Sequence, residues 1–234
     1  MAEGHPGRLA RGATAVGAGA GSRWRRPSGR DVQGFFEPRP RGPGRPRPPD
    51  RQPIWLGPPE DSFGVLVPLQ LVLVRTADLA VAIPGATAYR TGFGFDLAIR
   101  RAAAKDDAFA LDRTLHWLGR KGSPPPELLR VGVQFADGQK ATSLDTWWDY
   151  FDPQSWTQAP PSGPVLLPSG GGGGERVRSQ SYWVWPLPPD GPLAFVVEWP
   201  ALGVPLTQAV VDGALIRQAA AQDERLWPAD PSDA

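Results

Sequence analysis

The chain of 234 residues contains no cysteine and only two histidines, His5 and His116. Without cysteine there can be no disulfide, no thiolate ligand for zinc and no cysteine nucleophile. Two histidines are too few for a histidine-rich metal site. No run of about 18 apolar residues is present to form a transmembrane helix. We therefore expect no membrane span, no bound metal and no cofactor, and we predict a cytoplasmic protein.

Lysine is absent from residues 1–52, which carry 11 arginines and four acidic residues, a net charge of +7. The rest of the chain has 14 basic and 20 acidic residues, a net charge of −6. Residues 1–52 are also rich in glycine and proline, so they cannot bury enough apolar surface to offset the entropy cost of ordering. We predict a disordered Arg/Pro/Gly-rich tail over 1–52, one domain over 53–228 and a disordered end over 229–234. The same composition is typical of translated GC-rich upstream sequence, so an over-long start remains an alternative for the tail.

The segment Tyr182–Trp199 dominates the rest of the chain. Two aromatic-rich stretches flank Pro186–Pro192, which holds four prolines and one glycine. Apolar residues alternate with other residues in both stretches, and this period of two is typical of β-strands. The sequence therefore predicts a β-hairpin whose Trp/Phe face packs against a second sheet in the middle of the core. The residues on that face are Trp183, Trp185 and Leu187 on the first strand and Leu193, Phe195, Val197 and Trp199 on the second.

Other segments carry equally local signals. Tyr89–Ile99 alternates strictly between apolar and polar or small residues, as in an antiparallel strand with one buried and one solvated face. Asp137-Gly138 is typical of a two-residue hairpin turn, in which both central residues need positive φ. The glycine run Gly170–Gly174 predicts a flexible, exposed loop.

The C-terminal part predicts a helix. Asp212 is a good N-cap, and Gly213–Arg225 is rich in alanine, leucine and glutamine. The side chains predicted to face the body are Leu215, Ile216, Ala219 and Leu226. The fold class that follows is mainly β: an antiparallel β-sandwich of about 7–9 strands with a C-terminal α-helix and a disordered N-terminal tail.

Four motifs carry a resemblance to a known group of proteins. They are Trp55-x-Gly-Pro-Pro-Glu-Asp61, Gly132-Val-Gln-Phe-Ala-Asp-Gly138, the run of five glycines and Tyr182-Trp-Val-Trp-Pro-Leu-Pro-Pro189. Together they resemble an uncharacterised family of proteins from high-GC bacteria over about residues 54–228. The resemblance implies that this range is one unit and implies no activity, ligand or catalytic residue.

Carboxylates are the first candidates for chemistry. Glu198 lies opposite the buried face of its predicted strand, and a hydrolase could use it together with an aspartate. Asp145, Asp149 and Asp152 would share one helix face, where three carboxylates could also hold Mg²⁺ or Ca²⁺. An ordinary solvated charge explains each of these residues as well, and we favour that interpretation. His116 would have to serve any Ser-His-Asp triad, but no G-x-S-x-G elbow surrounds a serine, so we interpret it as a helix residue.

Tryptophan is abundant, with ten in the chain. Those at alternating strand positions are expected in the core. Trp147, Trp148 and Trp156 lie in irregular segments and are the candidates for an exposed sugar-binding platform.

No motif fixes a chemistry, so the function stays open at this point. The scarcity of catalytic residue types, the many aromatics and the Arg/Pro-rich tail favour a non-catalytic interaction or scaffold domain with a protein partner. A hydrolase using Glu198 and a sugar-binding module are the alternatives. We expect no specific nucleic-acid site, because the sequence indicates no groove beside the basic tail. The sequence does not indicate an oligomeric state.

Overall fold

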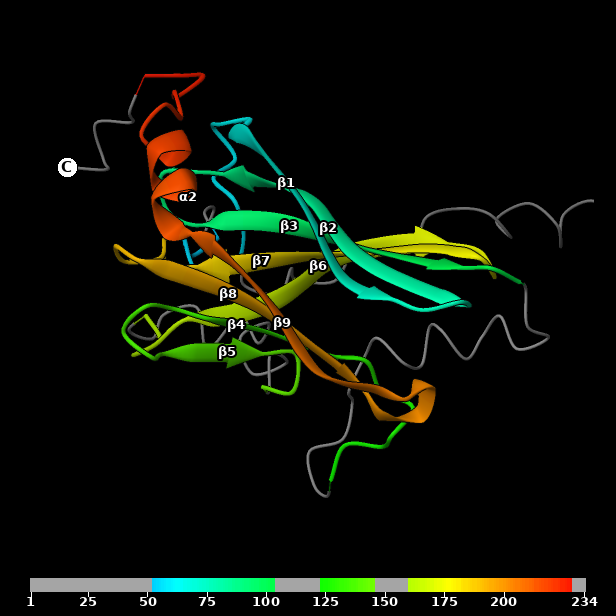
Figure 1. The fold of residues 1–234 in the computed structure, drawn as a ribbon. Coiled ribbons are helices and arrows are strands. Elements are labelled where there is room, and N and C mark those ends of the chain that lie inside the picture. Colours follow the sequence, from blue (N-terminus) through cyan, green and yellow to red (C-terminus); the bar gives the residue numbers. More distant parts are fainter. Residues whose placement is uncertain (1–51, 104–122, 146–159, 229–234) are drawn as a thin grey trace, which may run out of the picture. The chain divides into compact units, whose positions relative to one another are not determined.

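The computed structural model describes residues 52–103, 123–145 and 160–228, which all belong to one compact unit. Their nine strands are antiparallel and form two sheets (Figure 1). The five-stranded sheet has the order β1 (Val65–Arg75), β2 (Leu79–Ala88), β3 (Phe93–Arg101), β7 (Val177–Trp185) and β6 (Val165–Gly173). The four-stranded sheet has the order β5 (Lys140–Thr142), β4 (Arg130–Gln134), β8 (Pro192–Trp199) and β9 (Val204–Asp212). The predicted β-sandwich is therefore confirmed. The predicted tails lie outside these ranges apart from Gln52, and their disorder stays a prediction.

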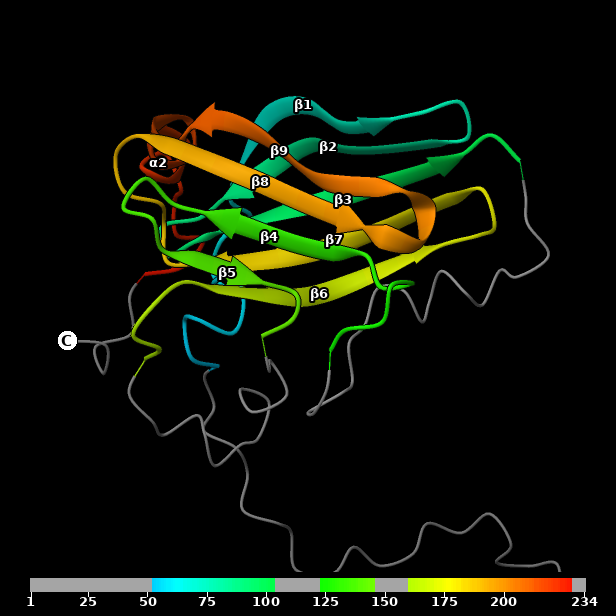
Figure 2. The ribbon, with the colours of Figure 1, turned by 60° about the horizontal axis from the view of Figure 1, so that its bottom comes forward.

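The two sheets pack face to face around one hydrophobic core (Figure 2). Rings from both sheets meet in its centre: Phe95 stacks on Tyr182 with ring centroids 5.4 Å apart and meets Phe195 edge-on at 5.1 Å. Aromatic contacts of this kind add ~0.5–1.5 kcal/mol beyond the apolar area they bury. In β3 and β8, the alternating residues that were predicted to face the core are buried. The buried residues are Phe93, Phe95, Leu97 and Ile99 on β3 and Leu193, Phe195, Val197 and Trp199 on β8.

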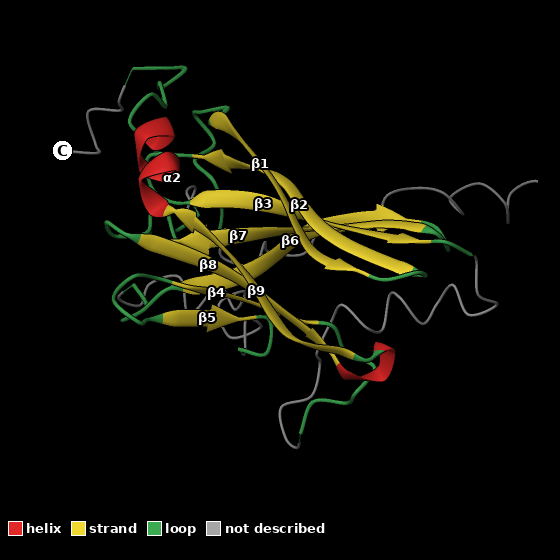
Figure 3. Ribbon diagram, in the orientation of Figure 1, coloured by secondary structure: helices red, strands yellow, loops and turns green. Residues whose placement is uncertain are grey.

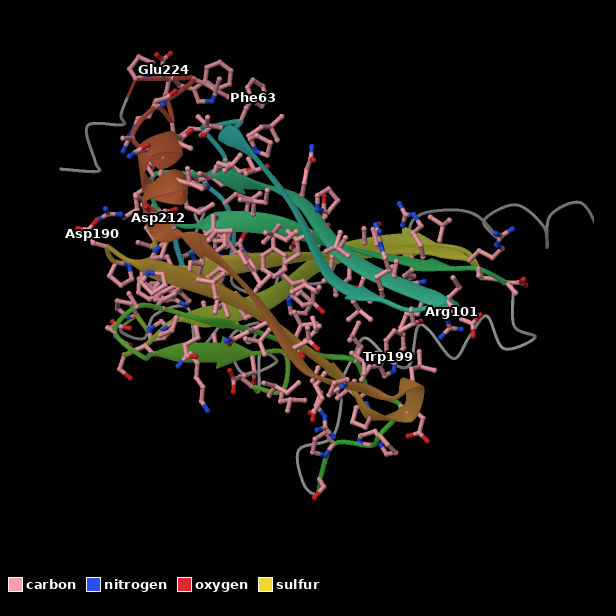
Figure 4. All side chains as sticks on the ribbon, viewed as in Figure 1. Phe63, Arg101, Asp190, Trp199, Asp212 and Glu224 are labelled. Atoms are coloured by element: carbon pink, nitrogen blue, oxygen red, sulfur yellow. The ribbon has the colours of Figure 1, made fainter. Side chains whose placement is uncertain are left out.

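Trp199 ends β8 and is only 1% exposed. Its indole Nε1 donates a hydrogen bond of 2.8 Å to the carbonyl of Glu127. The guanidinium of Arg101, which ends β3 in the other sheet, lies 5.7 Å from the centre of the Trp199 ring (Figure 4). The polar atom of this buried ring is thus satisfied, and the ring also links the two sheets.

The predicted hairpin over Tyr182–Trp199 is wrong. Strand β7 pairs with β3 and β6, whereas β8 pairs with β4 and β9. The proline-rich segment Pro186–Gly191 therefore crosses from one sheet to the other instead of forming a turn between neighbours. Alternation reports which side chains share a face, but it does not report which strand lies alongside, and a segment of this length can span the ~10 Å between packed sheets.

The face assigned to Trp183 and Trp185 is also wrong. Tyr182 and Val184 point into the core between the sheets. Trp183 points the opposite way and belongs to a second apolar cluster on the outer side of the five-stranded sheet. The prediction failed because apolar residues occupy both faces of β7. A period of two residues then does not indicate which face is directed toward the core.

The glycine run is a strand and not a flexible loop. Strand β6 continues through Gly173, and Gly170–Gly173 pair with Arg178–Ser181 of β7. At Gly171, a Cβ atom would lie 2.7 Å from Oε1 of the buried Gln180 and 2.8 Å from the carbonyl oxygen of Ser179. Glycine is required there because neighbouring backbone and a buried side chain occupy the space of a Cβ.

The turn at Asp137-Gly138 contains three residues and not two. Phe135 and Gln139 close the turn, and the Phe135 amide donates a hydrogen bond of 2.8 Å to the Gln139 carbonyl. Gly138 has φ +85°, whereas Asp137 does not have positive φ. This combination is the common three-residue hairpin, in which a left-handed residue follows a type I turn.

Helix α2 (Gly213–Ala220) follows β9 directly (Figure 3). The predicted N-cap is confirmed, because the Asp212 carboxylate accepts a hydrogen bond of 2.9 Å from the Ala214 amide. Ile216 and Ala219 are buried as predicted, but Leu215 and Leu226 are substantially exposed. The helix ends earlier than the predicted Arg225, so the periodicity does not extend to Leu226. In the described ranges, no helix is long and apolar enough to cross a bilayer.

Candidate functional site on the outer face of the five-stranded sheet

Small or polar residues, namely Gly94, Asp96 and Ser181, occupy part of the outer face of β3 and β7. The register places Gly94 beside Trp183 and Asp96 beside Ser181. Because Gly94 has no side chain and Ser181 has a short one, the middle of this face is lower than its margins. A concave surface results wherever larger residues stand on the neighbouring strands.

Strands β1 and β2 supply the larger residues on one side. Pairing across the sheet aligns Leu66 of β1 with Thr87 of β2, and Thr87 with Gly94. Leu66 is 82% exposed, an unusual degree of exposure for a leucine on a paired strand. A groove of about 500 Å³ lies on this face, and its apolar wall is formed by Leu66, Pro68 and Pro84.

One carboxylate lines the groove. Asp96 is exposed, and its Oδ1 accepts a hydrogen bond of 2.5 Å from the Ser181 hydroxyl. No cation among the described residues forms an ion pair with Asp96. The hydroxyl therefore orients a negative charge whose remaining lone pairs stay open to solvent.

An aromatic cluster borders the groove. Tyr89 meets Trp183 at a centroid distance of 5.7 Å, and both rings line the groove. Trp55 meets Trp185 edge-on at 6.4 Å, so the segment before β1 covers the outer side of β7. Burial raises the pKa of Tyr89, and the negative charge of Asp223 raises it further. The Tyr89 hydroxyl is therefore protonated at neutral pH.

A cluster of polar side chains stabilises the edge of the groove next to Tyr89. The Asp223 carboxylate, 1% exposed, accepts hydrogen bonds from the Ser62 hydroxyl and, at 2.9 Å, from the Arg90 amide. The Arg90 guanidinium also forms an ion pair with Asp61, and its hydrogen bond and charge hold the pKa of Asp61 below the ordinary 3.8. These contacts join the segment before β1, the turn before β3 and the segment after α2. Because each charged group here has a partner, we interpret the cluster as a structural clasp.

No family model, curated protein or solved structure matches this chain. The resemblance to an uncharacterised bacterial family therefore stays a hypothesis. The function has to be argued from the chain's own side chains.

Of the predicted carboxylates, Glu198 and Asp145 lie in the described ranges, and each has a different partner. Glu198 lies on the outer face of the four-stranded sheet, directly across from Arg130, and the two side chains form an ion pair. The Glu198 side chain is 31% exposed. It is therefore less exposed than we expect for a solvated surface charge without a partner. Asp145 accepts a hydrogen bond of 2.7 Å from the Thr142 amide and so stabilises the turn after β5. Among the residues in the described ranges, no three acidic or histidine side chains gather as metal ligands.

The other predicted site residues lie outside the described residues. They are His116, Asp149, Asp152, Trp147, Trp148 and Trp156. The histidine and tryptophan hypotheses therefore stay predictions.

Sequence reasoning missed the groove. The alternation of Tyr89–Ile99 did place Gly94 and Asp96 on the outward face, but this face was interpreted only as solvated. The missing information was that β7, about 85 residues later, adds Ser181 beside Asp96. A weak signal does exist in the sequence: Gly94, Asp96 and Ser181 are small or polar residues at outward positions of their strands.

Proposed function

We propose that the β-sandwich is a non-catalytic interaction domain, and that it binds an extended segment of another protein in the groove on the five-stranded sheet. The observation that carries this proposal is the exposed apolar wall at Leu66 beside the carboxylate of Asp96, which has no cationic partner within the described ranges. A matching segment would present an apolar side chain to the wall and a lysine or arginine to Asp96.

The apolar wall supplies the driving force. Leu66 is 82% exposed and is flanked by Pro68 and Pro84, which are also exposed. Fully burying a leucine side chain contributes ~1.5–3 kcal/mol, so one well-placed contact accounts for measurable affinity. Prolines keep this wall rigid, and little conformational entropy is lost when a partner covers it.

The carboxylate supplies selectivity. Ser181 holds Asp96 in one orientation, and a charge-assisted hydrogen bond to a lysine or arginine is stronger than a neutral one. An acidic segment would instead meet an uncompensated negative charge. The groove lies open along a sheet face, a shape that suits an extended chain better than a small molecule enclosed on most sides.

Binding can be tested with a panel of labelled peptides of about ten residues, the length of a strand. Each peptide has apolar residues around a central arginine, and a matched panel has glutamate in its place. We expect the arginine panel to contain binders by fluorescence anisotropy. Leu66→Asp and Asp96→Asn should each weaken them about tenfold, equivalent to ~1.4 kcal/mol.

Two matched variants act as controls. Val177→Asp places the same charge at another exposed apolar position of the same sheet, and Asp78→Asn removes another exposed carboxylate. Neither residue lines the groove. Equal binding of the arginine and glutamate panels, or equal weakening by Val177→Asp and Leu66→Asp, would refute the proposal.

The hydrolase and sugar-binding hypotheses remain. No observation in the described part of the chain favours either of them over the interaction domain.

A further inference from the structure

Among the described residues, four strands are edge strands: β1 and β6 in one sheet, and β5 and β9 in the other. An edge strand exposes unpaired N–H and C=O groups, and proteins that remain monomeric protect such edges with prolines, bulges, charges or short length. The four edges of this protein differ in this respect.

Three of the edges carry such protection. Strand β1 contains Pro68 and two register shifts, and its Gln70 has φ 51°. Strand β6 contains Pro168, a register shift and the glycine run. Strand β5 has only three residues, one of which is Lys140.

Strand β9 lacks this protection along most of its length. It has nine residues, and its only charged side chain is Asp212 at the end. On its outer face Leu206 is 67% exposed and Val210 is 53% exposed, with Gln208 between them. Pro205 and a register shift between Val204 and Thr207 lie near the start, and the pairing from Thr207 to Asp212 is uninterrupted.

The hydrogen-bond pattern shows which groups of β9 point to the open edge. The Gly213 amide donates to the Gly191 carbonyl at 2.8 Å, next to the pair Pro192–Asp212. Since the groups of an antiparallel strand alternate in direction, Ala209 and Val211 direct their N–H and C=O toward β8. Gln208 and Val210 therefore direct theirs away from β8. Strand β1 of the other sheet lies near β9 but is not paired with it.

We infer that a second copy of this chain pairs with β9, antiparallel and two-fold symmetric about Gln208. In this register Leu206 of each copy lies opposite Val210 of the other, and the two Gln208 side chains lie opposite each other. The joined sheet gains about six backbone hydrogen bonds. No like charges are brought together between Val204 and Val211, so the strand is complementary to itself. The result is a homodimer with one eight-stranded sheet made of two four-stranded sheets.

The dimer can be tested on the full chain by analytical ultracentrifugation and amide hydrogen exchange over a concentration series. We expect a monomer–dimer equilibrium, with the Gln208 and Val210 amides gaining protection as concentration rises. The Thr207 and Ala209 amides face β8 and should change little, so they are the internal control. A chain that stays monomeric at about 100 µM, a weak limit for a homodimer, would overturn the inference. So would a dimer in which Gln208 and Val210 exchange as fast as in the monomer.

A charge swap tests the register and does not depend on the stability of any one variant. Gln208→Lys and Gln208→Glu each place like charges opposite one another only at the two-fold axis, and each should raise the dimer dissociation constant about tenfold. Mixing the two variants should restore association as a heterodimer. Ser179→Lys, at an exposed position of the other sheet, is the matched control and should leave the dimer unchanged. A dimer insensitive to both Gln208 variants would refute pairing about Gln208.

Discussion

The glycines of β6 offer a sharp comparison between neighbouring residues. A Cβ on Gly171 would lie 2.7 Å from Gln180 Oε1 and 2.8 Å from the Ser179 carbonyl oxygen, well inside normal contact. A Cβ on Gly172, one residue later, would meet no heavy atom within 4 Å. Neither glycine has positive φ, so the substitutions Gly171→Ala and Gly172→Ala differ in space and not in backbone strain.

The expected cost of Gly171→Ala has two parts. Overpacking costs ~1–3 kcal/mol, because the Ser179 carbonyl belongs to the paired strand and moves little. Gln180 is 1% exposed, and its Nε2 donates to the carbonyls of Gly170 at 2.5 Å and Ser181 at 3.1 Å. Displacing this amide leaves buried polar groups unsatisfied at ~1–3 kcal/mol. We expect a total loss of ~2–6 kcal/mol for Gly171→Ala. For Gly172→Ala we expect a change between zero and a gain of ~1 kcal/mol.

Urea denaturation followed by tryptophan fluorescence gives both free energies of unfolding. The slope m should stay constant, so that shifts of the midpoint report stability. Adding Gln180→Ala removes one of the two contacts at Gly171. The double variant Gly171→Ala/Gln180→Ala should therefore cost less than the sum of its single variants. Equal midpoints for Gly171→Ala and Gly172→Ala, or full additivity with Gln180→Ala, would refute the packing described here.

Two further predictions concern the core and the polar cluster around Asp223. Phe195→Ala should lower the free energy of unfolding by ~3–5 kcal/mol, because the ring is 1% exposed. Glu198→Gln should lower it by at most ~1 kcal/mol, because the ion pair of Glu198 with Arg130 is partly solvated. Similar losses for both variants in denaturation experiments would contradict the assigned faces of β8. Because Arg90 lowers the pKa of Asp61, ionised Asp61 stabilises the fold above pH 3.8, and this contribution is lost as the pH falls through its lower folded-state value. The stability difference between the wild type and Asp61→Asn should therefore be present at pH 7 and decline below about pH 4; a difference unchanged down to pH 2 would contradict the ion pair.

The sequence by itself determined the fold class and several local features. Alternation identified β3 and β8, because a strand with one buried face must repeat every two residues. Asp212 indicated the start of α2, because the free amides at a helix N-terminus need a side-chain acceptor. The burial of Phe195 and Trp199 followed from the same local rule.

Tertiary structure decided which strands are neighbours and therefore what each face contains. Tyr182–Trp199 alternates as a hairpin would, yet its halves belong to different sheets, since pairing depends on partners far away in sequence. The glycine run resembles a linker until Gln180 and the Ser179 carbonyl are placed against Gly171. The groove and the edge position of β9 also depend on the order of strands in the sheets. Ser181 can donate a hydrogen bond to Asp96 because β7 pairs with β3, and β9 is an edge because only β8 pairs with it. Local sequence encodes periodicity and capping, whereas strand order is set by the free energy of packing the whole core.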